Sequence, residues 1–182
     1  RLPTLWNTLC RSLALDKVLY SWELFSGREM RHWSQQSEAE VEVINGCFWI
    51  ARRQAVEKVG GLDERFFFYA EDVDWCRRFW ESGWRVTFVP QATATHFGGG
   101  SSSSAPLRYS IEMLRANLAY WKKHHGIAEQ GAFYLLTIVH HALRLICRGT
   151  KVVVCRNPPA EISYKCKRSS VCLRWLINGN VV

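Results

Sequence analysis

The stretch FFFYAEDVDWCRRFW, residues 66–80, places four aromatic side chains directly before three carboxylates, those of Glu71, Asp72 and Asp74. From position 72 onward the apolar residues fall close to helical spacing, and a Ser-Gly pair at 82–83 ends the pattern. The sequence therefore predicts a helix with an acidic first turn. Carboxylates at a helix start cap free N–H groups and meet the positive end of the helix dipole. A carboxylate beside an aromatic wall is instead partly desolvated and becomes a better general base. From the pattern alone both interpretations remain open.

The segments on either side of this helix predict an alternation of strands and helices. Residues 41–53 are rich in β-branched and aromatic side chains and predict a strand, with Gly46 as a break. Residues 53–66 predict a short helix that stops at Gly60-Gly61, and residues 84–90 alternate like a strand. The order strand, helix, acidic helix, strand is typical of the later half of an α/β domain.

The loop at residues 92–106 joins a histidine to a run rich in glycine and serine. His96 is a candidate metal ligand, provided that carboxylate and phosphate oxygens complete the shell of a Mg2+ or Mn2+ ion. Glycine lets a backbone approach a diphosphate closely and serine donates hydrogen bonds, so four residues are candidates for a diphosphate loop: Gly98, Gly99, Gly100 and Ser101. A structural histidine and a flexible linker are the alternatives.

The C-terminal part of the chain predicts two helices and a basic tail. Apolar residues recur at steps of four and three over 107–121, which predicts an amphipathic helix ending near Gly126. Residues 132–147 predict a more apolar helix that is too short to span a membrane; a core helix and a helix lying on a bilayer both fit. Residues 148–182 carry seven Lys or Arg against one Glu. An anionic membrane surface, nucleic acid and plain solvation all suit such a tail, but no nucleic-acid-binding motif occurs and we expect no such partner.

The composition is that of one globular domain, with 182 residues, of which 48% are hydrophobic, and a net charge of +8 that comes mostly from the tail. Seven cysteines without a C-x-x-C pair favour a reducing, cytoplasmic environment over a disulfide scaffold.

Four motifs follow one another between residues 41 and 104: a G-x-F strand followed by Arg-Arg, the turn VGGLDERF, the helix start EDVD, and H-x-G-G-G-S. In this order they resemble the C-terminal half of family 2 glycosyltransferases, especially the bacterial rhamnosyltransferase-like members. The resemblance implies an α/β fold: the later half of a GT-A domain, which is the Rossmann-like fold of nucleotide-diphospho-sugar transferases, followed by amphipathic helices and a basic tail.

The resemblance also implies a role for each matching residue. Asp72 matches the catalytic base that deprotonates the acceptor hydroxyl, whose oxygen then attacks the anomeric carbon of the sugar with inversion. His96 matches the histidine that helps to bind the divalent metal, Mg2+ or Mn2+, on the donor diphosphate. The expected acceptor pocket is lined by Glu71, Asp74, Trp75, Gly46 and Cys47.

The expected organisation is a partial GT-A domain at 1–126 that holds the acceptor side and the base, an apolar helix at 127–147 and a basic tail at 148–182. The family's first half, with the nucleotide pocket and the D-x-D metal motif, does not occur in this sequence, whose one D-x-D, Asp72-Val73-Asp74, matches the later base motif instead. We therefore expect the isolated chain neither to bind donor properly nor to turn over. The expected function is part of an inverting glycosyltransferase. It would transfer a sugar such as rhamnose from a nucleotide-diphospho-sugar to a glycan or lipid-linked acceptor, at the cytoplasmic face of the cell membrane. The alternative is a non-catalytic membrane- or glycan-binding module that keeps the acceptor half of the fold.

Overall fold

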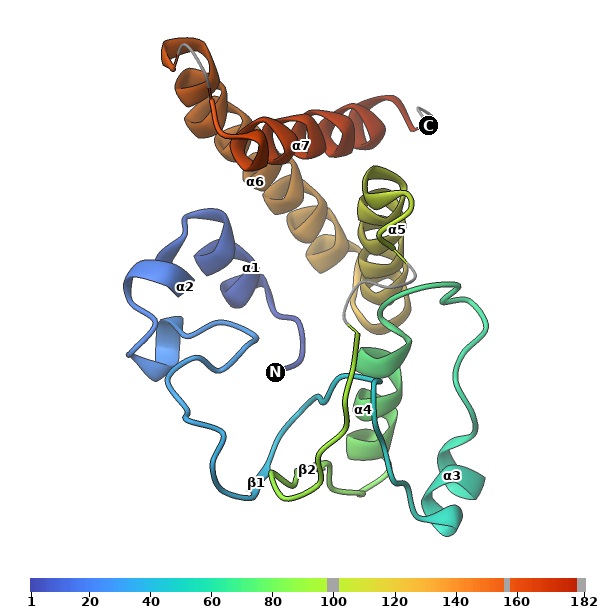
Figure 1. The fold of residues 1–182 in the computed structure, drawn as a ribbon. Helices are drawn as coiled ribbons and strands as arrows, with labels where there is room; N and C mark the ends of the chain where they lie inside the picture. Colours follow the sequence, from blue (N-terminus) through green and yellow to red (C-terminus); the bar gives the residue numbers. More distant parts are fainter. Residues whose placement is uncertain (98–101, 156–157, 180–182) are drawn as a thin grey trace.

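The computed structural model describes residues 1–97, 102–155 and 158–179, and most of them are helical (Figure 1). One half of the molecule is a helical assembly in which the long helix α6 packs against α7 and α1, while α5 packs against α6 and α7. Its helices are α1 (Leu5–Ser12), α5 (Pro106–His124), α6 (Ile127–Val154) and α7 (Ala160–Asn178). The short helix α2 (Leu15–Val18) and the 3-10 turn η1 (Glu23–Phe25) follow α1.

The other half holds the strands β1 (Ala39–Glu40) and β2 (Thr87–Phe88) and the helices α3 (Arg53–Val59) and α4 (Glu71–Glu81). β1 and β2 pair in antiparallel register, with Ala39 opposite Phe88. A small core of Val41, Cys76 and Val86 fixes α4 against this ladder. The acidic helix is therefore held by residues on both sides of it in the sequence.

The predicted strands at 41–53 and 84–90 are wrong in extent, because each described strand is only two residues long. Residues 41–52 run alongside α4 without regular hydrogen bonding, apart from the bond that the Val41 N–H donates to Val86 O at 2.9 Å. A strand needs a neighbour to satisfy its backbone groups, and in a two-stranded ladder each strand has a neighbour on one side only. The predicted α/β alternation is thus present in element order, but the described part of the chain is mostly helical.

The acidic helix matches its prediction closely, since α4 begins at Glu71 and ends at Glu81, before Ser82-Gly83. Its start is unusual: Tyr69 and Ala70 have φ angles of +69° and +66°, a left-handed conformation that costs about 1–2 kcal/mol per non-glycine residue. Packing compensates for this cost, because Ala70 is buried with Phe66, Val73 and aromatic residues of α5 and α6.

The C-terminal helices differ from their predictions in length. Helix α6 runs from Ile127 to Val154 rather than over 132–147, and the segment expected to be a basic tail holds a further helix, α7. Cys172 and Leu176 of α7 are buried against α5. Many basic residues stand between these apolar ones in the sequence, so the helical spacing is hard to recognise there. None of the helices in the described ranges combines the length and the apolar character that crossing a bilayer requires.

Candidate active site

The structure separates the three carboxylates of the α4 first turn into three environments. Asp74 is fully buried where the start of α4 meets the end of α5. Its oxygens accept from Arg78 Nε at 2.8 Å, His124 Nε2 at 2.6 Å and Lys123 Nζ at 2.5 Å. Burial by itself raises the pKa of Asp74, but these hydrogen bonds outweigh it and lower the pKa to about 2. Asp74 is thus the centre of an ionic cluster that joins the two helices, and it does not face an open pocket.

Asp63 extends this cluster. Its carboxylate binds Lys123 Nζ at 2.6 Å and the Arg65 guanidinium at 2.7 Å. The hydrogen bonds from these two cations lower the pKa of Asp63. The VGGLDERF turn therefore anchors itself to the end of α5, which fixes the aromatic run that leads into α4.

Asp72 is half-buried at the second position of α4 and forms no ion pair with the described residues. One carboxylate oxygen accepts from the Val73 N–H at 2.8 Å, which sets the orientation of the side chain. Gly46 lies directly opposite: a Cβ built on it would stand 3.6 Å from Asp72 Cβ. The structure thus brings together two predicted site residues that are distant in sequence, and it leaves an Asp72 oxygen available to a hydroxyl proton.

Glu71 experiences the desolvation that the aromatic neighbourhood predicts. Its Oε2 is buried and has no hydrogen-bond partner among the described residues. Burial raises the pKa of Glu71, and the negative charge of Asp72 adds to this effect. Glu71 and Asp72 form a pair of adjacent carboxylates in which Glu71 holds a proton more readily than an ordinary glutamate.

Trp75 belongs to an aromatic cavity of about 580 Å³ beside α4. Its ring packs against Trp49 and Phe79, with centroids 5.0 and 4.9 Å away, and its indole N–H donates to Gly60 O at 2.8 Å. The indole nitrogens of Trp49 and Trp84, which also line this cavity, are buried without a partner in the described part of the chain. Flat aromatic walls with free N–H donors suit a ligand that has apolar faces and hydroxyl groups.

Cys47 lies apart from Trp75 in a larger open cavity of about 870 Å³. The Cys47 thiol is free and the residue is exposed. Trp49 and Ile50 line both cavities, so the two are neighbours across the segment that follows Gly46. Arg28, which sequence reasoning did not identify, lines the larger cavity and lies close enough to Asp72 for the carboxylate charge to raise its pKa against the stronger effect of burial.

His96 is exposed and lies two residues beyond Ala94, which lines this larger cavity. The candidate diphosphate loop of Gly98, Gly99, Gly100 and Ser101 lies outside the described residues. Among the residues that are described, no three His, Cys, Asp or Glu side chains gather as a metal site would require. A single imidazole does not make a Mg2+ or Mn2+ site.

The sequence holds only weak signals for the site residues that its motifs did not identify. Nothing in the sequence around Arg28 distinguishes it from the other basic residues. The cations around Asp74 are 4, 49 and 50 positions away from it in the sequence. Only the meeting of α4 with the end of α5 shows that Asp74 is structural while its neighbour Asp72 remains available.

Comparison with known proteins identifies the family of the chain. The family model described as "Glycosyl transferase family group 2" matches residues 16–180, and the chain therefore belongs to that family of glycosyltransferases. Membership implies the GT-A fold. No solved structure matches the chain.

Two kinds of bacterial relatives are similar to part of the chain. The N-acetylglucosaminyl-diphospho-decaprenol L-rhamnosyltransferase of Mycobacterium tuberculosis is 39% identical over 92 residues, which are 50% of this chain and 30% of that protein. The rhamnosyltransferase WbbL of Escherichia coli K12 is 34% identical over 61 residues, 34% of this chain and 23% of that protein. The matched region thus spans less than a third of the length of these relatives.

Proposed function

We propose that this chain supplies the acceptor side and the catalytic base of an inverting glycosyltransferase, as the later part of a GT-A domain. The transferred sugar would be rhamnose or a similar sugar, taken from a nucleotide-diphospho-sugar and added to a glycan or lipid-linked acceptor. The names of the relatives support the sugar and the acceptor class. The observation that carries the proposal is the Asp72 carboxylate, oriented by Val73, unpaired among the described residues, and facing Gly46.

In this proposal Asp72 accepts the proton of the acceptor hydroxyl as that oxygen bonds to the anomeric carbon. The bond from the anomeric carbon to the diphosphate breaks on the opposite face, and the diphosphate leaves with the electron pair, so that the configuration inverts. A half-buried carboxylate is suited to this task, because fewer waters compete for the proton and for the attacking oxygen. Arg28 places a fixed positive charge near Asp72.

The aromatic cavity beside Trp75 is the proposed place for the acceptor sugar. Trp49 and Trp75 present ring faces for the C–H surface of a sugar, and the free indole N–H groups of Trp49 and Trp84 are donors for its hydroxyls. Glu71 lies next to Asp72 and is partly desolvated, and burial raises its pKa.

A peripheral position at the inner face of the cell membrane remains part of the proposal. Leu135, Val139 and Ile146 of α6 are exposed at spacings of four and seven, which aligns them in one apolar stripe. A stripe of this kind can lie in a bilayer interface while the rest of the helix packs on α1 and α7.

Asp72→Asn in the enzyme that carries this sequence tests the base role. The substitution keeps the shape and removes the proton acceptor, so we expect kcat to fall about 10²- to 10⁴-fold with KM for the acceptor little changed. Glu71→Gln is the matched control and should retain much more activity, because in this proposal Glu71 does not accept the proton of the acceptor hydroxyl. Transfer by Asp72→Asn at a rate near that of the wild type would exclude the base role and favour a non-catalytic glycan-binding module.

A further inference from the structure

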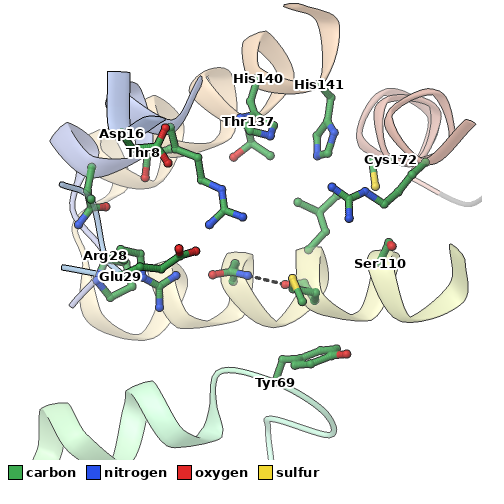
Figure 2. A pocket seen from close by; sticks show the side chains of 18 of the residues that line it. Thr8, Asp16, Arg28, Glu29, Tyr69, Ser110, Thr137, His140, His141 and Cys172 are labelled. Carbon is green, nitrogen blue, oxygen red and sulfur yellow. Dashed lines mark hydrogen bonds between the residues drawn. The ribbon is translucent and has the colours of Figure 1, made fainter. Parts of the chain in front are cut away.

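A third cavity, distinct from the two beside α4 and Cys47, lies among α1, α5, α6 and α7 and measures about 460 Å³ (Figure 2). Its lining is strongly basic: Arg11 comes from α1, Arg28 and Arg31 from the segment after η1, and Arg168 from α7. We call it the arginine cavity. These residues are up to 157 positions apart, so the folding of the helical half gathers cations that the sequence keeps separate.

Most of this positive charge has no counter-charge. Arg31 is paired with Glu29 at 2.5 Å, but Arg11, Arg28 and Arg168 contact no carboxylate among the described residues. Asp16 is the remaining acid of the lining, and its buried Oδ1 has no partner there either. Arg28 and Arg168 are half-buried, whereas Arg11 is exposed. A half-buried cation without a partner is costly, because it loses hydration that nothing replaces. An arrangement of this kind is accounted for by an anion that completes it.

Two histidines of α6, His140 and His141, lie in the positive electrostatic field of these arginines. His140 and His141 line the arginine cavity, and His141 Nδ1 is buried without a partner in the described part of the chain. Burial, together with the nearby charges of Arg144, Arg168 and Arg11, lowers the pKa of His140 to about 3 and that of His141 to about 4. Both imidazoles are therefore neutral near pH 7, and they add hydrogen-bonding capacity to the cavity without adding charge.

We propose that the arginine cavity binds a diphosphate group through Arg11, Arg28 and Arg168. Planar guanidinium groups from three directions match the several oxygens of a phosphate, each of which accepts charge-assisted hydrogen bonds. The volume exceeds what one phosphate needs and leaves room for the start of an attached group. Hydroxyl groups of the lining, such as those of Tyr109 and Tyr164, can bind a bridging oxygen.

The cavity is connected to the candidate active site. Arg28 lines both the arginine cavity and the larger cavity that contains Cys47, and its pKa responds to Asp72. Tyr69, which directly precedes the left-handed Ala70 at the start of α4, lies at the edge of the arginine cavity in Figure 2. This inference deepens the proposed function and rests on it for the source of the diphosphate, which is either the lipid-linked acceptor or the nucleotide-sugar donor.

Calorimetric titration of the chain with inorganic diphosphate, at constant ionic strength, tests the site. We expect saturable binding that weakens roughly ten- to a hundredfold in Arg168→Gln and in Arg11→Gln, because each loses charged hydrogen bonds. Arg108→Gln, an exposed arginine of α5 outside the cavity, is the matched control and should bind as the wild type does. Equal affinity in the wild type and both cavity variants, or no binding at all, would overturn the proposal.

Two further measurements keep the test independent of folding and of catalysis. Without ligand, Arg168→Gln should unfold at the same or a higher urea concentration than the wild type, because it removes a repelling charge. If Arg168 served packing alone, the variant would unfold at a lower urea concentration and its affinity for diphosphate would be unchanged. Asp72→Asn should still bind diphosphate even if it abolishes transfer, so the binding site and the base role fail separately. Tighter binding of geranyl diphosphate than of uridine diphosphate assigns the site to the lipid-linked acceptor, and the reverse order assigns it to the donor.

Discussion

The ionic cluster around Asp74 gives the sharpest test of how the structure divides the acidic stretch. Asp74→Asn keeps the shape of a side chain that is fully buried and removes the charge that Arg78, Lys123 and His124 share. The pKa of Asp74 falls from 3.8 to about 2, which corresponds to about 2 kcal/mol of stabilisation by its partners. Removing one partner of a buried ion pair costs about 3–5 kcal/mol, because the other charge stays buried and unpaired. In the variant Lys123 still has Asp63 as a partner, which places the loss at the lower end of this range. We therefore expect a loss of about 3 kcal/mol in the free energy of unfolding.

Urea unfolding followed by the fluorescence of the nine tryptophans measures this loss. Asp72→Asn is the matched control, two residues away in the same helix turn, and should cost less than about 1 kcal/mol because Asp72 has no ion-pair partner among the described residues. The difference between the wild type and Asp74→Asn should also depend on pH. Because the folded pKa is lowered, the stabilisation is complete above 3.8 and is lost as the pH falls through about 2. An Asp74→Asn protein within about 0.5 kcal/mol of the wild type at pH 7 would refute the reasoning.

Three other expectations concern stability. Ala70→Val should lose about 2 kcal/mol, since a β-branched residue suits neither φ of +66° nor a buried site, whereas Ala70→Gly should stay within about 1 kcal/mol of the wild type. Trp121→Ala, which removes a ring stacked 4.6 Å from Phe133, should lose about 3–5 kcal/mol, and the exposed Trp22→Ala should change little. Since the pKa values of His140 and His141 are lowered, the unfolded chain binds more protons below pH 6.5, and the free energy of unfolding should fall by about 2 kcal/mol per histidine, about 4 kcal/mol in all, between pH 7 and pH 5. The double variant to glutamine should abolish that slope; an unchanged slope would place the titrating groups elsewhere.

The helices with a clear apolar period could be predicted from the sequence. The α4 boundaries follow from the Val73, Cys76 and Phe79 spacing and from Ser82-Gly83, and α5 follows in the same way from its apolar steps. The strands could not be sized, because the length of a strand depends on which neighbour pairs with it. α7 was missed because its burial against α5 involves few residues among many basic ones.

The family could also be predicted from the sequence, because four motifs in a fixed order can be recognised without the structure. What the sequence could not decide is which acid of EDVD is available. Glu71, Asp72 and Asp74 are nearly equivalent in the sequence, and their difference arises from partners that are distant along the chain. Lys123 and His124 neutralise Asp74, while Asp72 lies opposite Gly46 and forms no ion pair with the described residues. The same holds for the arginine cavity, whose cations come from opposite ends of the chain. Charge acts through space, and only the tertiary structure sets which charges meet.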